Sequence, residues 1–430
     1  MQKTNETQLA HRRRRILRYA PTRKRAGSAA ETSTEAPPGG TSVSVGVVDP
    51  WAGKLPDMDP GSDVLRARSD VVGSLLRPPE LLQARAEFSR SELSAAAFKR
   101  VEDAAVDEAL RMQADAGLEV VTDGEMRRLS FQSQLTEAVD GFGEWDLDAF
   151  LWGTWRSDEF GERTVARPPL AVVGKLRRRR FLSAEEFTYA RRRTDRILKV
   201  TLPSPSLFAN FWDPERSTAV YPRLEDFLGD VAEILREEVD ELVRLGAAYI
   251  QIDAPHYPLF VDPGYREFYA SRGWQAERWI EMGAELDAMV VGDHPEVTFA
   301  MHLCKGNQMS RWLVAGGWDW LAPRLLPRVP VQRWLLEYDD ERSGGFEPLR
   351  AVPDGSVAVL GLVTTKTGRV ETVEELEARI REAARCVPLE RLALSPQCGF
   401  ATSVVGNELS VEEEQAKLRV IGETARRVWG

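Results

Sequence analysis

The chain has 430 residues, 43% of them hydrophobic, and its 57 basic and 67 acidic side chains give a net charge of −10. Its length and apolar content allow one large barrel domain or two ordinary domains. Three cysteines argue against a disulfide framework. No apolar run predicts a membrane span or a signal peptide, and the acidic balance disfavours nucleic acid as a partner, so we expect a cytoplasmic protein.

Residues 1–61 predict a disordered, basic, low-complexity tail. Arginines gather between positions 12 and 25, and a stretch rich in Ser, Thr, Pro and Gly follows from Ala26 to Gly46. A segment of this composition cannot bury enough apolar surface to order itself. The alternatives are a solvated tail, an extension that results from an upstream start codon, and an arm that binds nucleic acid or another partner.

From residue 62 onward, strand patterns and helix patterns alternate. Eight apolar runs predict strands at 70–73, 118–121, 198–202, 249–252, 298–303, 334–336, 357–363 and 392–394. Amphipathic patterns between them predict helices, for instance over 224–245 and 373–384. Eight such units predict an α/β fold, a (β/α)8 TIM barrel over residues 62–430, with a doubly wound sheet as the alternative. An excursion at about 140–196 is too long for a plain loop and is expected to cover the barrel mouth.

Polar side chains follow the predicted strands, at the rim where a barrel carries its working residues. In chain order they are Ser74 and Arg77, Asp123 and Glu125, Ser204, Asp253 and His256, His302 and Cys304, Glu337 and Asp339, Thr365 and Lys366, and Cys398. Loop residues are commonly polar, so polarity alone does not indicate an active site, and the types of residue at these positions must be considered.

Four rim residues are of types that bind zinc: His302, Cys304, Glu337 and Cys398. Because they follow three strands of one predicted sheet, they suggest a single Zn²⁺ site. Such a site keeps a bound thiol ionised at neutral pH, which suits alkyl transfer to sulfur. The alternative is that these cysteines are small buried hydrophobes, as we expect for Cys386 in its helical stretch.

Several segments resemble the C-terminal catalytic barrel of cobalamin-independent methionine synthase, a member of the uroporphyrinogen decarboxylase and methionine synthase superfamily. The segments are 70–74, 117–125, 249–253, 302–304, 336–337 and 394–399, and the resemblance spans about residues 65 to 430. It implies that the four rim residues named above hold Zn²⁺. It also implies that Ser74, Glu125 and Asp253 bind homocysteine, the two carboxylates pairing with its ammonium group. Ordinary ion pairing at the rim is the alternative for the two acids.

The resemblance implies zinc-dependent methyl or alkyl transfer to homocysteine or a related amino-acid thiol. The donor would be a folate, a corrinoid protein or another electrophile, and the chain could form a homo-oligomer. The thiol would lose its proton at the metal and attack an electrophilic carbon by in-line displacement. His256 or Lys366 would be the catalytic acid that protonates the leaving group, unless both are structural.

The chain departs from the long methionine synthases in ways that favour other donors. Only the low-complexity tail stands where they carry an N-terminal barrel, and Thr364-Thr-Lys366 stands where they have an Asp-Ile-His element. The sequences at the last two predicted strands and the loops after them resemble those of short single-barrel relatives, including the epoxyalkane:coenzyme M transferases. A thiol transferase that opens an epoxide, a carbon-sulfur lyase, a non-catalytic zinc-binding barrel and a zinc-free decarboxylase-like barrel are the alternatives. The basic run 177–180 would suit an anionic substrate or form a solvated face.

Overall fold

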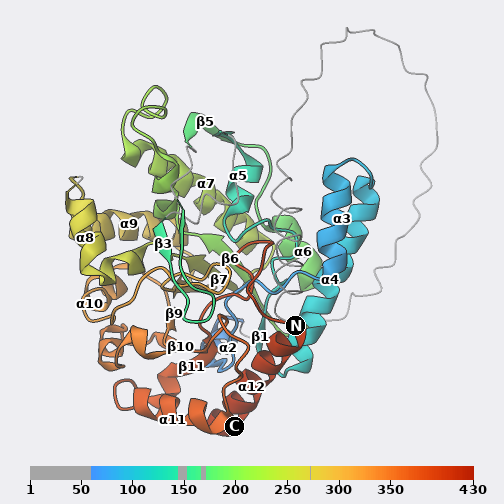
Figure 1. The fold of residues 1–430 in the computed structure, drawn as a ribbon, viewed down its shortest axis with the longest axis vertical. Coiled ribbons are helices and arrows are strands. Elements are labelled where there is room, and N and C mark those ends of the chain that lie inside the picture. Colours follow the sequence, from blue (N-terminus) through green and yellow to red (C-terminus); the bar gives the residue numbers. More distant parts are fainter. Residues whose placement is uncertain (1–59, 144–152, 166–170, 272) are drawn as a thin grey trace.

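Seven parallel strands form one curled sheet in the interior of the molecule (Figure 1). The computed structural model describes residues 60–143, 153–165, 171–271 and 273–430. In sheet order the strands are β1 Val120–Val121, β6 Ile197–Pro203, β7 Tyr249–Asp253, β8 Thr298–Leu303, β9 Arg333–Glu337, β10 Val357–Val363 and β11 Leu392–Pro396. Sheet order follows chain order without a reversal, which excludes the doubly wound alternative for this sheet.

The predicted strand at 70–73 is not present as a strand, and the pairing at this place in the sheet is limited to Ser69, one residue before it. Ser69 forms a parallel bridge with Leu394 of β11. On its other side, the carbonyl of Ser69 accepts a hydrogen bond from the Val120 N–H of β1 at 3.2 Å. Ser69 therefore lies between the two edge strands of the sheet. The predicted α/β class is confirmed as a curled parallel sheet of TIM-barrel-like form.

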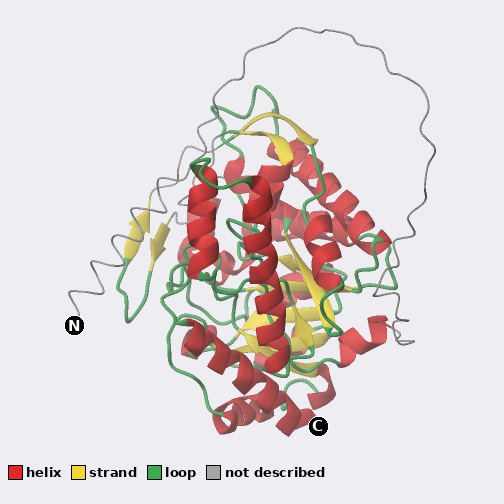
Figure 2. Cartoon of the chain, turned by 90° about the vertical axis from the view of Figure 1, so that its right-hand side faces the viewer, coloured by secondary structure: helices red, strands yellow, loops and turns green. Residues whose placement is uncertain are grey.

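Helices surround the sheet (Figure 2). They are α2 Pro60–Arg66, α3 Pro79–Ser89, α4 Ala95–Asp115, α5 Ser133–Ala138, α6 Ala184–Arg191, α7 Leu224–Arg244, α8 Pro263–Ala270, α9 Ala276–Val291, α10 Ala322–Leu325, α11 Val373–Ala383 and α12 Val411–Trp429. In α7, Phe227, Val231, Leu235 and Val239 are fully buried at helical spacing, so one face of this helix packs on the core. The predicted helices over 224–245 and 373–384 are thus present as α7 and α11. Among the described residues, none of the helices is both long and apolar enough to cross a membrane.

The segment between β1 and β6 carries two short antiparallel pairs. β2 Val139–Phe142 pairs with β5 Val172–Arg178, and β3 Gly153–Trp155 pairs with β4 Arg163–Val165. These pairs occupy the stretch in which the sequence predicts an excursion. Residues 144–152 and 166–170 of that stretch, and all but the last two residues of the predicted tail, lie outside the described residues.

The basic run 177–180 lies on the surface and is ion-paired. Arg177 and Arg179 both contact Asp140, at 3.1 Å each, and Arg178 contacts Glu237 at 2.6 Å. These contacts favour the solvated face over the rim of a substrate pocket.

A buried ion cluster fills the sheet interior between β6, β7 and β9. The Asp70 carboxylate receives Lys199 Nζ at 2.8 Å, an Arg333 guanidinium nitrogen at 3.1 Å and the Tyr249 hydroxyl at 2.8 Å. Asp70, Lys199 and Arg333 are all but inaccessible to solvent. A single carboxylate therefore compensates two buried cations, and their charges depend on it.

We expect Asp70→Asn to lower the free energy of unfolding by about 3–5 kcal/mol, because it leaves Lys199 and Arg333 without a counter-ion in the core. Urea denaturation measures this change. Asp115→Asn is the control, since Asp115 contacts Arg111 on the surface with 65% of its side chain exposed and should change stability little. Equal effects of the two substitutions would contradict this account of the interior.

Candidate functional site

Three potential metal ligands converge at the carboxyl ends of the strands. His302 lies in β8, Cys304 directly follows it and Cys398 follows β11. Their ligand atoms all lie within 4.8 Å of one another, and the two sulfurs are 3.8 Å apart. Two thiolates bound tetrahedrally to zinc at ~2.3 Å would be separated by ~3.8 Å, whereas a disulfide needs ~2.0 Å. The chemistry and spacing of these donors therefore fit Zn²⁺.

The His302 ring is held from both sides by neighbouring acceptors. Nδ1 lies 3.1 Å from Asp253 Oδ1, and Nε2 lies 3.2 Å from the Gln397 carbonyl oxygen. Beside it, the Cys398 sulfur and burial raise the pKa of Cys304 well above its ordinary value. In the absence of a cation this thiol keeps its proton, so metal binding must release it.

Glu337, the fourth predicted ligand, contacts Lys305, the residue that follows Cys304, but both of its carboxylate oxygens have other partners. Oε2 accepts the Lys305 backbone N–H at 2.7 Å, and Oε1 receives Lys366 Nζ at 3.2 Å. The group of metal-type ligands found in the described residues comprises His302, Cys304 and Cys398. If Glu337 binds the metal, one of its oxygens must either contact the metal while keeping its hydrogen bond from Lys305 or Lys366, or give up that hydrogen bond.

One cavity connects the His-Cys-Cys group with the residues predicted to bind substrate. Its lining includes Ser74, Glu125, Asp253, His256, His302, Cys304 and Cys398. Apolar and aromatic side chains form much of the remaining wall, among them Phe131, Trp155, Leu207, Phe211, Leu259 and Leu313, and polar side chains such as Gln132, Asn210, Asn307, Gln308 and Thr402 complete it. The cavity thus offers an acidic, sulfur-bearing end and an apolar wall, which suits a small amine-bearing thiol and a second, less polar reactant.

Glu125 sits on a strained turn directly after β1. Its φ is +54°, in the left-handed region that few residues other than glycine adopt, and Asp123 stabilises the turn by accepting its N–H at 2.9 Å. Glu125 Oε1 accepts the Thr201 hydroxyl at 2.8 Å, while Oε2 is buried without a hydrogen-bond partner among the described residues. Burial, together with the nearby charge of Asp253, raises the pKa of Glu125. An ammonium group between the two acids would relieve both effects.

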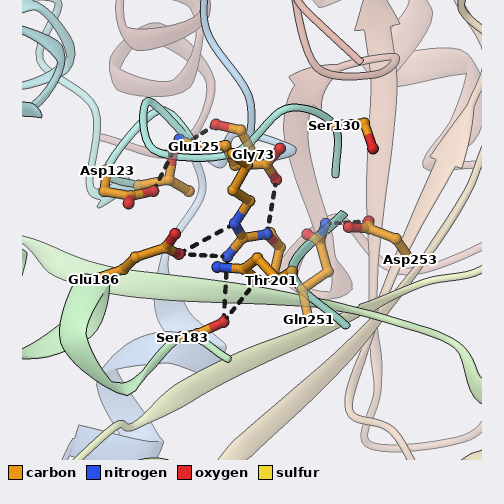
Figure 3. A network of polar contacts seen from close by, with 12 residues as sticks. Gly73, Asp123, Glu125, Ser130, Ser183, Glu186, Thr201, Gln251 and Asp253 are labelled. Carbon is orange, nitrogen blue, oxygen red and sulfur yellow. Dashed lines mark hydrogen bonds and ion pairs between the residues drawn. The ribbon is translucent and has the colours of Figure 1, made fainter. Parts of the chain in front are cut away.

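Arg128 forms an ion pair with Glu125, and Figure 3 shows Glu125, Thr201 and Glu186 gathered in one network of polar contacts. The Arg128 guanidinium lies 3.4 Å from Glu125 Oε1, donates to the Thr201 hydroxyl at 2.7 Å and pairs with Glu186 at 3.0 Å. All of these side chains are buried. The network therefore fixes the direction in which the Glu125 carboxylate points, and it leaves the second carboxylate oxygen, Oε2, available to a ligand.

Two glycines make room for the substrate-binding residues. A Cβ on Gly73 would lie 2.7 Å from Glu125 Oε1, and a Cβ on Gly399 would lie 2.1 Å from Ser74 Oγ. Neither distance is sterically allowed, and the Gly399 backbone lies directly against Ser74. Glycine at these positions lets the loops after three strands approach one another at the cavity.

His256 lines the cavity but is a poor proton donor at neutral pH. Its Nε2 lies 2.7 Å from Ser206 Oγ, and its Nδ1 is buried without a hydrogen-bond partner among the described residues. Burial lowers the pKa of His256 to about 3. The ring is thus neutral in the folded protein, and its Nδ1 is available to a ligand in the cavity.

This shifted pKa predicts a pH dependence of stability. Between the ordinary pKa of 6.5 and about 3, the unfolded chain takes up a proton at His256 more readily than the folded chain, so stability is lost as pH falls. We expect His256→Gln to remove on the order of 1–2 kcal/mol of the stability loss between pH 6.5 and 5. Denaturation curves with a chelator present, so that metal release does not contribute, test this. Equal losses of stability between pH 6.5 and 5 in the wild-type protein and in His256→Gln would contradict this prediction.

Lys366, the other predicted acid, is not among the residues that line the cavity. Its Nζ lies 3.2 Å from Glu337 Oε1 and 3.0 Å from Asp339 Oδ2. Burial opposes its charge, but the two carboxylates outweigh burial and raise the pKa of Lys366. The structure favours the structural alternative for this residue.

Three other residues of the site, Gln132, Arg128 and Gln251, escape sequence reasoning. Gln132 and Trp155 line the cavity, and the Gln132 amide oxygen and the Trp155 Nε1 are buried without partners among the described residues. Arg128 forms an ion pair with Glu125, and the Gln251 amide donates a hydrogen bond to Asp253. The only available signal was the spacing of Arg128, three residues after Glu125; the others follow from the fold.

The fold and the cavity define a class of protein: a TIM-barrel-like α/β protein with a His-Cys-Cys group and two carboxylates at the carboxyl ends of its strands. A family model described as "Cobalamin-independent synthase, Catalytic domain" matches residues 68–426. The chain belongs to this family, as the resemblance of its sequence predicts.

Individual relatives extend this finding. The uncharacterized protein YxjH of Bacillus subtilis (strain 168) is 33% identical over 365 residues, covering 84% of this chain and 94% of that protein. A 5-methyltetrahydropteroyltriglutamate--homocysteine methyltransferase from Synechococcus sp. (strain JA-2-3B'a(2-13)) is 27% identical over 341 residues, which cover 77% of this chain and only 40% of the methyltransferase.

A solved structure agrees with the fold. A B12-independent methionine synthase from Shewanella sp. W3-18-1, in complex with selenomethionine, superposes with a TM-score of 0.63 at 21% identity, covering 84% of this chain and 97% of that one. At this identity the likeness concerns the fold alone.

Proposed function

We propose that the protein is a zinc-dependent alkyltransferase that transfers a methyl or related alkyl group to homocysteine or a similar amino-acid thiol. The observation that carries the proposal is the cavity that brings His302, Cys304 and Cys398 together with Ser74, Glu125 and Asp253. The first three residues would hold Zn²⁺, with Glu337 as the predicted fourth ligand. Zinc in such a site lowers the pKa of a thiol and so supplies a nucleophile at neutral pH.

The chain's own residues would bind and orient the thiol substrate. Glu125 and Asp253 would pair with its ammonium group, and Ser74, which lines the same cavity, would bind its carboxylate. The apolar wall would exclude water from the reacting carbon and hold the alkyl donor for in-line displacement. Because His256 is neutral and Lys366 is engaged by two carboxylates, the arrangement favours a donor whose leaving group departs without strong acid assistance.

Elemental analysis, followed by zinc-edge X-ray absorption with and without homocysteine, tests this proposal. We expect about one zinc per chain and a gain of one sulfur ligand on adding homocysteine. Alkylation assays with folate, methyl-corrinoid and epoxide donors would then identify the donor. No zinc, or a zinc shell indifferent to every thiol, would overturn the proposal, and sulfur release without an acceptor would point to a lyase.

A further inference from the structure

A continuous line of polar contacts joins the buried ion cluster of the sheet interior to the His-Cys-Cys group. Lys199 Nζ donates to Gln251 Oε1 at 2.6 Å, and Gln251 Nε2 donates to Asp253 Oδ1 at 2.7 Å. Asp253 Oδ1 in turn lies 3.1 Å from His302 Nδ1. Figure 3 shows the contact between Gln251 and Asp253. Gln251 is therefore the link between the rigid interior and the site.

The orientation of the Gln251 amide is fixed by its partners. Lys199 carries only donors, so the oxygen of the amide must face it and the NH₂ group must face the other way. There it donates to Asp253 Oδ1 and to the Val72 carbonyl oxygen, the latter at 2.9 Å. Gln251 is fully buried, and the Asp70 carboxylate holds Lys199 in place. The amide has no alternative arrangement that satisfies these groups.

This arrangement assigns separate tasks to the two oxygens of Asp253. Oδ1 receives the Gln251 amide and lies against the His302 ring. Oδ2 is thereby left as the oxygen that can face a ligand in the cavity, which Asp253 lines. Carboxylates that orient a metal-binding imidazole contribute to metal affinity, and they do so only when they are held themselves.

We infer that Gln251 is a positioning residue. It fixes the Asp253 carboxylate so that one oxygen orients His302 for metal binding and the other receives the ammonium group of the thiol substrate. The second of these roles rests on the proposed function, whereas the first requires only that the His-Cys-Cys group binds a metal. Gln251 itself is neither one of the His-Cys-Cys residues nor among the residues that line the cavity.

Gln251→Leu tests the inference with two readouts on the full chain. Competition with a chromophoric chelator should show zinc affinity about tenfold weaker. Calorimetry should show that homocysteine loses its advantage over 4-mercaptobutanoate, the same thiol without the amine. Gln251→Glu keeps an acceptor for Lys199 but loses the donor to Asp253, so it should show the same losses and serves if the leucine variant does not fold.

Gln332→Leu is the matched control, because Gln332 also fixes backbone through its side chain, accepting the Phe299 N–H at 2.7 Å, but precedes β9 at the opposite end of the strands. It should alter neither readout. Zinc affinity within about twofold of wild type in both Gln251 variants, or equal losses in the control, would overturn the inference. Wild-type protein without any preference for the amine would overturn the proposed substrate instead, and the zinc readout would still decide the role of Gln251.

Discussion

Cys398→Ser is expected to reduce zinc from about one ion per chain to a small fraction, and alkyl transfer to a thiol by at least a factor of about 100. The physical reason lies in the ligand set: Cys398 supplies one of two sulfurs 3.8 Å apart, and a serine hydroxyl neither ionises at neutral pH nor matches the softness of a thiolate. Cys304→Ser should have the same effect. Elemental analysis of the purified variants, with assays at added zinc, measures both quantities.

Cys386→Ser is the matched control, since Cys386 is the remaining free cysteine, lies between α11 and the start of β11, and is not part of the His-Cys-Cys group. It should leave zinc content and activity unchanged. If all three variants keep their zinc, the His-Cys-Cys group is not a metal site, and the proposal of a zinc-activated thiol fails with it. If Cys386→Ser alone loses zinc, the ligand assignment is wrong.

The sequence predicted the elements of this fold well because their signals are local. Helix α7 repeats its apolar residues at helical spacing, and strands such as β10 are continuous apolar runs between polar segments. The first strand is weaker in the structure than in the sequence, because its pairing is limited to a bridge between Ser69 and Leu394 on one side and a hydrogen bond from the Val120 N–H to Ser69 on the other. Its apolar pattern reflects burial of Val71 and Val72 rather than extensive pairing.

The sequence also brought together the residues that the fold places in one cavity, since carboxyl ends of parallel strands meet at one rim. It did not resolve what each side chain contacts there. Glu337 ends β9 and Lys366 follows the neighbouring strand β10, and only the three-dimensional arrangement reveals that they contact each other at 3.2 Å. The pairing of Gln251 with Asp253 is similarly invisible, because an amide in an apolar strand carries no sign of the cation behind it.

Glu125→Gln is expected to lower kcat/KM for homocysteine by about 30- to 150-fold, corresponding to about 2–3 kcal/mol, while changing that for 4-mercaptobutanoate by less than about threefold. Glutamine keeps an oxygen for the Thr201 hydroxyl, and Arg128 keeps its ion pair with Glu186, so the turn should survive. What is lost is the negative charge that would meet the ammonium group. Steady-state kinetics with both thiols measures the difference.

Glu125 is a sharper probe of the amine than Asp253, because Asp253 also contacts His302 and its replacement would disturb the metal ligands. The control is Glu238→Gln, a fully buried acid of α7 that accepts the backbone N–H groups of Leu182 and Ser183 away from the cavity. It should cost stability and leave the preference between the two thiols intact. Equal losses for both thiols in Glu125→Gln would mean that this carboxylate only supports the turn, and the substrate would then be a thiol that needs no amine.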